Sequence, residues 1–269
     1  MLLFPNCKIN IGLNIVRKRN DGYHDLETVF YPVGLKDALE VIHSQENAFK
    51  ITGLPVAGSF EDNLCTKAYQ LLKNNFPDLP PVSIHLHKAI PMGAGLGGGS
   101  ADGAFMLALL NKKFQLNLTV NQLTDYALQL GSDCPFFIIN KPCFATGRGE
   151  QLKKIQLDLS MYKIVLVNPG IHISTKEAFS KLKPQRAEKT VEQLITQPIA
   201  TWKNEVKNDF EEPVFKLHPA IEQIKNDLYT AGALYASMTG TGSTVYGIFP
   251  PNTNVALSFP DSYRVISLP

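Results

Sequence analysis

Residues 91–101 read PMGAGLGGGSA, and the mostly apolar run DGAFMLALL follows them at once at residues 102–110. Glycine permits backbone dihedral angles that are closed to other residues, and it lets the main chain approach a ligand with no Cβ in the way. A glycine-rich loop that leads into a helix presents free N–H groups and the positive end of the helix dipole to an anion, usually phosphate. The sequence therefore predicts a loop that binds the phosphates of a nucleotide. Its residues are Pro91, Met92, Gly93, Ala94, Gly95, Leu96, Gly97, Gly98, Gly99, Ser100 and Ala101.

The spacing of the glycines narrows the kind of phosphate loop. A P-loop requires Lys and then Ser or Thr after its last glycine, whereas Gly98 is followed by Gly99 and Ser100. Residues 93–98 formally match G-x-G-x-x-G, but no acidic residue stands about 20 positions further on to hold a ribose, as a dinucleotide site requires. The alternative to a phosphate-binding loop is a flexible linker with no function in binding. It is disfavoured because the loop lies between an alternating strand, residues 82–87, and an apolar helix.

Composition places the chain among ordinary globular proteins. Its 269 residues are 44% hydrophobic and 19% charged, with a formal net charge of +2. This charge gives no reason to expect a nucleic acid or a membrane surface as a partner, and no apolar stretch approaches the length of a bilayer span. The four cysteines are widely separated, which predicts neither a zinc site nor a disulfide framework, and the amino terminus lacks the basic lead-in of a signal peptide. We expect a cytoplasmic protein with reduced cysteines, whose oligomeric state the sequence does not determine.

Hydrophobic periodicity predicts strands and helices that are mixed without a strict βαβ order. The clearest strand is residues 8–15, and one of its faces carries Ile9, Ile11, Leu13 and Ile15. Further strands are expected at residues 23–33, 38–43, 82–87, 163–168, 234–238, 243–249 and 263–268. Helices are expected from a cap at Asp62 or Asn63 toward Pro77, after the glycine loop, and at residues 118–130 and 220–231. The fold class is therefore α+β, with two domains at residues 1–155 and 156–269.

Three separated motifs together resemble the GHMP kinases, the superfamily of galactokinase, homoserine kinase, mevalonate kinase and phosphomevalonate kinase. The glycine loop is similar to the phosphate-binding motif of that superfamily. Residues 5–10, PNCKIN, resemble its first motif, and residues 237–244, SMTGTGST, resemble its third. Thr239 and Thr241 stand where serines are commoner, but threonine keeps the hydroxyl group. Gly103 stands where alanine is usual, and a glycine within a helix costs up to ~1 kcal/mol.

The resemblance implies a two-domain fold, with an amino-terminal half like ribosomal protein S5 domain 2 and a ferredoxin-like carboxy-terminal half. It implies a kinase that phosphorylates an alcohol group, with ATP as co-substrate and Mg²⁺ accompanying the nucleotide through ligands that the sequence does not identify. Four segments narrow it to the branch that acts on the tertiary 2-hydroxyl of a cytidylyl-bearing small molecule in non-mevalonate isoprenoid synthesis. These segments are KINIGLNI at 8–15, DGYH at 21–24, ETVF at 27–30 and GSDCPF at 131–136.

Asp133 and Lys8 are the candidate catalytic residues. An alcohol nucleophile needs an acceptor for its proton, and Asp133 lies just past Gly131, where the preceding helix is expected to end. From the residues alone, Asp133 reads more simply as the N-cap of a helix with Pro135 in its first turn. The resemblance instead places the superfamily's catalytic aspartate here. Lys8 lies on the polar face of the first strand and would favour the ionised carboxylate; a solvated edge-strand lysine is the alternative.

The resemblance also implies residues that contact the two substrates. Tyr23 would stack on the cytosine, His24 would hydrogen-bond it, and Phe179 would close its other side, unless Phe179 is simply a core residue of a helix. Asn63 corresponds to an adenine-side residue, although it is equally a good helix N-cap. The remaining implied substrate contacts are Asn10, Thr175 and Gly240.

Two other functions stay open at this point. Another GHMP kinase could act on homoserine or a mevalonate derivative, with a different pattern at residues 21–24. A non-enzymatic nucleotide- or RNA-binding module is disfavoured by the small net charge and the lack of a Lys/Arg stripe. His85 and His87 alternate on a strand as a metal-binding pair would, but no cysteine or carboxylate nearby completes a ligand set, so a solvent-facing pair is favoured.

Overall fold

The computed structural model describes residues 1–174, 178–179, 182, 184–185 and 187–268. Thr175, one of the predicted substrate contacts, lies outside these ranges. The contacts between residues divide the chain into two compact units. Unit 1 consists of Met1–Lys8, Pro32–Met92 and Gly97–Lys141, and unit 2 of Ile9–Tyr31, Gly93–Leu96 and Pro142–Pro269. These units interleave along the chain; the domain boundary at residue 155 would cut the chain once, and it stays a prediction.

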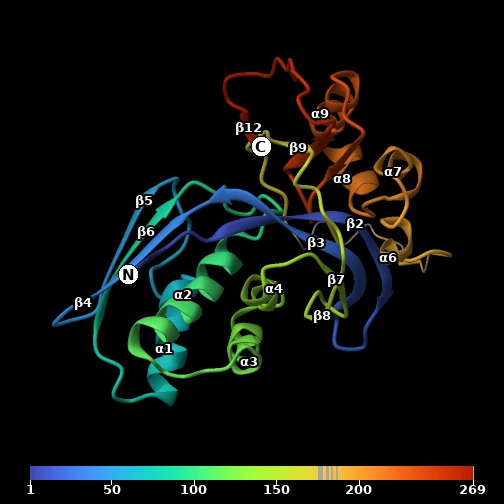
Figure 1. The fold of residues 1–269 in the computed structure, drawn as a ribbon. Helices are drawn as coiled ribbons and strands as arrows, with labels where there is room; N and C mark the ends of the chain where they lie inside the picture. The colour runs from blue at the N-terminus through green and yellow to red at the C-terminus, as the bar shows by residue number, and fades with distance from the viewer. Residues whose placement is uncertain (175–177, 180–181, 183, 186, 269) are drawn as a thin grey trace. The chain divides into compact units, whose positions relative to one another are not determined.

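Unit 1 combines one sheet with four helices. The sheet has the strand order β1 (Leu2–Leu3), β4 (Ala38–His43), β6 (Val82–Lys88) and β5 (Ala48–Gly53), with β5 parallel to β6 and the other pairs antiparallel. The helices are α1 (Leu64–Asn75), α2 (Gly98–Phe114), α3 (Val120–Leu130) and α4 (Cys134–Ile139). Helix α2 is central, because it contacts each of the other three helices and also β4 (Figure 1). This position explains why the helix after the glycine loop is apolar nearly all round.

Gly103 lies where α2 meets its neighbours most closely. A Cβ at this position would come within 2.9 Å of the Leu64 Cβ in α1 and 3.4 Å of Leu130 Cδ1 in α3. The missing methyl group therefore allows close packing between helices. The small loss in helix propensity expected from the sequence is offset by that packing.

The strand β2 (Asn6–Lys18) is buried on both of its faces through Ile15. The alternation predicted from the sequence is present, but the face with Lys8, Asn10 and Asn14 is as buried as the face with the isoleucines. The alternative of a solvated edge lysine at position 8 is therefore wrong. Polar groups on a strand that is buried on both sides require partners, and these partners define the candidate site.

Most of β2 belongs to unit 2, which contains two sheets. One has the strand order β2, β3 (His24–Lys36), β7 (Cys143–Thr146) and β8 (Gln151–Lys154); the other has the order β10 (Tyr235–Met238), β11 (Val245–Phe249), β9 (Lys163–Asn168) and β12 (Arg264–Leu268). The helices are α6 (Val191–Leu194), α7 (Ile199–Glu205), α8 (Glu211–Leu217) and α9 (Pro219–Thr230). Helix α9 lies along β10 and β11 (Figure 1). Its apolar residues Ile221, Ile224 and Leu228 join the core of the unit.

Every strand expected from periodicity is present within three residues of its predicted ends, and so are the helices α1, α3 and α9. Helix α2 continues to Phe114, four residues beyond the apolar run that predicted it. The strands β1, β5, β7 and β8 and the short helices α6, α7 and α8 were not predicted, because they are too brief to show a clear period. Strand β8 lies in a polar stretch and carries two lysines, as edge strands commonly do. The α+β class is confirmed. Across the described ranges, no helix combines the length and apolar character needed to cross a bilayer.

Candidate active site

Lys8 and Asp133 form an ion pair within unit 1. The Lys8 Nζ lies 3.6 Å from the Asp133 Oδ2, and the side chains are 4% and 34% exposed respectively. Burial lowers the pKa of Lys8, and the neighbouring Asp133 carboxylate opposes that effect by its charge and by a hydrogen bond. The carboxylate is thus open to solvent on one side while its partner ammonium is enclosed. The two residues that the sequence analysis paired are together in the structure.

The backbone around Asp133 explains how its side chain is left available. Asp133 occupies the N-cap position of α4, with a proline in the first turn, as the residues alone predicted. Its backbone is in the right-handed helical region, however, and its carboxylate makes no capping hydrogen bond to the described backbone of α4. A conventional N-cap has extended dihedral angles and uses its side chain on the helix. The side chain therefore faces Lys8 instead of the helix end.

The second half of the glycine loop forms the N-terminus of α2. Gly97 is the N-cap residue and has a left-handed backbone, with φ of 70°. A Cβ on Gly97 would lie 3.0 Å from the Phe137 Cζ and 3.2 Å from the Lys8 Cε. A seventeen-residue helix with no side chain over its first N–H groups is suited to an anion. The phosphate role predicted for residues 91–101 fits this geometry and remains a prediction.

We expect Gly97→Val to abolish nucleotide binding. The β-branched side chain disfavours the positive φ, clashes with Phe137, and displaces the Lys8 side chain next to the helix N-terminus. Isothermal calorimetry with ATP measures the effect. Gly34→Val is the matched control, because Gly34 lies in β3, has no positive φ, and would place an added Cβ more than 4 Å from any neighbour. ATP affinity equal to that of the wild type, in a Gly97→Val protein with a native circular dichroism spectrum, would contradict the phosphate loop.

A buried triad of charges supports the strand that enters the loop. The Lys88 ammonium contacts Asp37 and lies 2.6 Å from the Asp102 Oδ2, with all three side chains almost fully buried. The Asp37 Oδ1 accepts the N–H groups of Ala89 and Ile90, at 2.6 and 2.8 Å. The triad therefore links the end of β6 to α2. It could not be predicted from the sequence, because nothing local marks residues so far apart in the chain as neighbours.

Two carboxylates against one ammonium leave a net negative charge unless one carboxyl group is protonated. Burial raises the pKa of Asp102 to about 7, against the opposing charge of Lys88 and together with the repulsion from Asp37. The Asp102 Oδ1 has no hydrogen-bond partner among the described residues, so nothing there stabilises a second negative charge. The pKa of Lys88 is raised by the two carboxyl groups despite its burial. A triad in which Lys88 is charged and Asp102 is protonated has no net charge. This state is consistent with the raised pKa of Lys88 and the raised pKa of Asp102.

This arrangement predicts a loss of stability as pH rises through neutrality. The folded protein keeps a proton on Asp102 that the unfolded chain releases near its ordinary pKa, so the stabilisation is complete in acid and is lost through the folded pKa. We expect the free energy of unfolding to fall by about 1 kcal/mol between about pH 6 and about pH 8. Asp102→Asn, which is permanently neutral, should remove this dependence in urea titrations. Asp125→Asn, on an exposed position of α3, is the control; an unchanged slope in Asp102→Asn would refute the assignment.

In unit 2, Asn10 and Thr239 bring the first and third motifs together. The Thr239 Oγ1 accepts the backbone N–H of Asn10 at 3.0 Å and donates to the Gly95 carbonyl at 3.0 Å. The Asn10 amide donates to Thr28 Oγ1 at 3.0 Å. A Cβ on Gly95 would lie 1.9 Å from the Thr239 carbonyl oxygen, so only glycine fits there. Thr239 thus makes these hydrogen bonds at a position where serine is commoner. Gly240, the next residue, also lies close to Gly95, since an added Cβ would be 3.2 Å from the Gly95 Cα.

The residues predicted to hold a cytosine lie near the β2–β3 hairpin of unit 2. The rings of His24 and Phe179 are stacked, with centroids 4.7 Å apart and planes at 26°. Tyr23 is exposed, and the Arg148 guanidinium lies 4.9 Å from its ring centroid. Partial burial and the charge of Lys18 lower the pKa of His24, which favours the neutral ring near pH 7. A base cannot lie between His24 and Phe179 as they stand, and Arg148 is a neighbour that the sequence analysis did not identify.

Phe179 packs on the core of unit 2, which confirms its interpretation as a core residue, and its ring also stacks on His24. Its contact with a cytosine stays a prediction. Asn63 is the N-cap of α1, with its Oδ1 accepting the Cys65 N–H at 2.9 Å, so the capping interpretation is confirmed. An adenine-side role for Asn63 stays a prediction. His85 and His87 each hydrogen-bond the Thr52 hydroxyl at 2.9 Å, and the described residues contain no group of three or more potential metal ligands.

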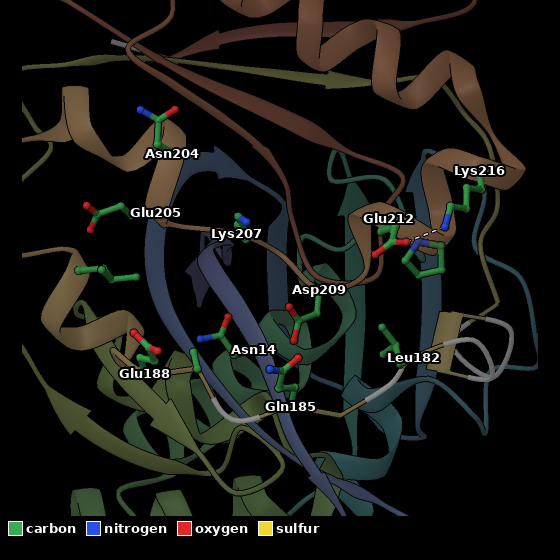
Figure 2. A pocket seen from close by; sticks show the side chains of 13 residues that line it. Asn14, Leu182, Gln185, Glu188, Asn204, Glu205, Lys207, Asp209, Glu212 and Lys216 are labelled. Atoms are coloured by element: carbon green, nitrogen blue, oxygen red, sulfur yellow. Dashed lines mark hydrogen bonds and ion pairs between the residues drawn. The ribbon is translucent and has the colours of Figure 1, made fainter.

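A polar cavity of about 820 Å³ lies elsewhere in unit 2 (Figure 2). Its walls include Asn14 from β2, Glu205 from the end of α7, and Glu212 from α8. Asn14 and Asp209 both face the cavity in the close view. None of the described residues that line it was predicted as a site residue, and the catalytic candidates are not among them.

Comparison with known proteins assigns the chain. The model of the GHMP kinases N terminal domain matches residues 63–141, and that of the GHMP kinases C terminal domain matches residues 188–260. A protein of Bacteroides fragilis named 4-diphosphocytidyl-2-C-methyl-D-erythritol kinase is 51% identical over 259 residues, covering 95% of this chain and 94% of that protein. One of the same name from Bacteroides thetaiotaomicron is 52% identical over 255 residues, covering 93% of each. The chain belongs to the GHMP kinase family.

Solved structures agree with this assignment. A crystal structure of 4-(cytidine 5'-diphospho)-2C-methyl-D-erythritol kinase matches with a TM-score of 0.80 and 30% identity, covering 92% of this chain and 90% of that one. A homoserine kinase from Cytophaga hutchinsonii matches with a TM-score of 0.73 and 15% identity, covering 98% of this chain and 94% of that one. The second likeness shows the fold alone. The GHMP kinase fold expected from the three motifs is confirmed.

Proposed function

We propose that this chain transfers the γ-phosphoryl group of ATP to the 2-hydroxyl of 4-diphosphocytidyl-2-C-methyl-D-erythritol, giving the 2-phosphate and ADP in non-mevalonate isoprenoid precursor synthesis. The observation that carries the chemistry is the Lys8–Asp133 pair in the unit that also holds the N-terminus of α2. The substrate comes from the shared name of relatives that match over nearly the whole chain at about half identity.

In this proposal Asp133 accepts the proton of the attacking hydroxyl group. The new bond joins the substrate oxygen to the γ-phosphorus, the bond to the β,γ-bridging oxygen breaks, and ADP leaves. Such transfers have a loose transition state, so that positioning and charge stabilisation contribute more than early deprotonation. Lys8, held 3.6 Å from the carboxylate, stabilises charge on the oxygen atoms during the transfer. The free N–H groups at the start of α2 would bind the phosphates.

Mg²⁺ would accompany ATP and reduce the negative charge of its phosphates. A magnesium ion bound mainly by phosphate oxygens and water needs only one or two protein ligands. The Ser100 hydroxyl is a suitable oxygen donor of unit 1, and it interacts with the thiol of Cys134, the residue next to Asp133. Ser100 is therefore our candidate for holding the ion.

Tyr23, His24 and Phe179 would recognise the cytidylyl group. Their rings give stacking surfaces, and a neutral His24 has both a donor and an acceptor for the edge of a cytosine. Roles for Asn10, Gly240, Asn63 and Thr175 in binding the substrates, a cytoplasmic location, and independence from nucleic acids remain predictions from the sequence.

We expect Asp133→Asn to lower turnover by about 10²–10⁴-fold while ATP affinity stays close to that of the wild type. The amide cannot take the hydroxyl proton, and the effect matches the usual contribution of a positioned base. Steady-state kinetics and calorimetry measure the two quantities, with Asp125→Asn as a control of the same chemistry on the surface of unit 1. An Asp133→Asn enzyme with half of the wild-type turnover would remove this residue from the mechanism.

The choice of acceptor separates the proposal from other GHMP kinase activities. With ADP release coupled to a dehydrogenase, kcat/KM for the cytidylyl substrate should exceed the values for homoserine and mevalonate by at least about 10⁴-fold, since a site that pairs with a polar group rejects compounds lacking it. Phosphorus NMR of the product should show one new phosphomonoester. Comparable rates on homoserine or mevalonate would overturn the substrate assignment and leave the family unchanged.

A further inference from the structure

Residues 208–211, Asn-Asp-Phe-Glu, link several parts of unit 2, and the proposed chemistry gives them no role. We call them the NDFE segment; it follows α7 and ends at Glu211, the first residue of α8. The sequence shows no periodicity there, and none of the four residues was a site candidate. Each side chain nevertheless has a specific partner within unit 2.

The NDFE segment is anchored on β2. The Leu13 N–H donates to the Lys207 carbonyl, and the Asp209 N–H donates to the Leu13 carbonyl, both at 2.8 Å. The Asp209 Oδ2 also accepts the Ile15 N–H at 2.6 Å. Figure 2 shows Asp209 near Asn14, which lies between these two strand residues. The segment thus extends the edge of the strand that carries Asn10.

Asn208 is buried and has hydrogen bonds on both ends of its amide. Its Nδ2 donates to the Met238 carbonyl at 2.7 Å and to the Gly240 carbonyl at 2.9 Å, and its Oδ1 accepts the Phe210 N–H at 3.0 Å. Glu211 adds the complementary bond, because its Oε1 accepts the Met238 N–H at 2.8 Å. β10 is an edge strand of its sheet, so these side chains satisfy backbone groups that no neighbouring strand reaches.

The bonds of Asn208 lie on either side of Thr239. That residue donates to the Gly95 carbonyl at 3.0 Å, and a Cβ added at Gly240 would lie 3.2 Å from the Gly95 Cα. With so little space, a displaced Met238 or Gly240 carbonyl moves Thr239 against the first half of the glycine loop. A change at Asn208 is therefore transmitted to Gly95, although Asn208 does not itself belong to a phosphate-binding motif.

Phe210 acts at the other end of the segment. Its ring is buried and meets Phe179 edge-on, with centroids 4.8 Å apart and planes at 83°. Phe179 in turn stacks on His24. Phe210 thus supports the aromatic pair that we assign to the cytidylyl group, while Asn208 supports the loop that we assign to ATP.

We propose that Asn208 is a positioning residue for the ATP-binding glycine loop, acting through Met238–Gly240, and that Phe210 is a positioning residue for cytidylyl recognition, acting through Phe179. The inference rests on the proposed function for its second half only, because ATP binding can be measured without any acceptor. Neighbouring residues of one segment would then set the affinities for two different substrates.

Asn208→Asp and Phe210→Leu test the two roles separately. The aspartate keeps the shape of Asn208 but places an acceptor against two carbonyl oxygens, so the dissociation constant for ATP should rise by about 10- to 100-fold. The KM for the cytidylyl substrate should change by less than about 3-fold. Phe210→Leu should do the opposite, raising that KM by about 10-fold and leaving ATP binding unchanged. Asn204→Asp, an exposed position at the end of α7, is the matched control.

Calorimetry with ATP and steady-state kinetics give these values, and thermal melts report folding. If Asn208→Asp does not fold, Asn208→Ala removes the same donors without adding charge and is measured in the same way. ATP affinity within 2-fold of wild type in the folded variant, or equal losses for both substrates in both variants, would overturn the proposal. A wild-type enzyme that binds ATP but does not phosphorylate the cytidylyl compound would defeat the proposed function, and calorimetry on Asn208→Asp would still decide the first role.

Discussion

A lysine ammonium enclosed by protein is the constraint on which the chemistry of unit 1 depends. Lys8 lies on a strand that is buried on both faces, where an unpaired charge would be strongly disfavoured. Asp133 opposes the effect of burial on the Lys8 pKa, so α4 has to present that carboxylate toward β2. The right-handed backbone at Asp133 and the absent Cβ at Gly97 are both consistent with this requirement.

Features of this fold that depend on neighbouring residues could be predicted from the sequence. The glycine loop, the alternation of β2 and the cap at Asn63 each occupy about ten consecutive residues or fewer, and their physics is local. The resemblance to the GHMP kinases predicted that Lys8 and Asp133 pair. The residues alone would not have predicted this, because helix capping was the simpler explanation for Asp133. The structure shows that capping by position and pairing by side chain occur together.

Long-range polar networks could not be predicted. Lys88 reaches Asp37 across 51 positions, and Asn10 reaches Thr239 across 229. Lysine, aspartate and asparagine are usually found at the surface, so nothing in their spacing marks them as buried partners. The stacking of His24 on Phe179 and the bonds of Asn208 are of the same kind. Each of these contacts depends on how sheets and helices pack after the local elements have formed. The positioning roles that we propose rest on contacts of this long-range kind.

Chemical labelling of the four cysteines can report local unfolding of this protein. Cys7, Cys65, Cys134 and Cys143 are free and buried. Burial raises the pKa of Cys7 and of Cys134 to about 12 and that of Cys143 to about 11, so almost no thiolate is present at neutral pH. Alkylating reagents attack the thiolate, and the native fold is therefore inert to them. Since Cys7 precedes Lys8 and Cys134 follows Asp133, slow labelling at these two positions would time the local unfolding of the segments that carry the ion pair.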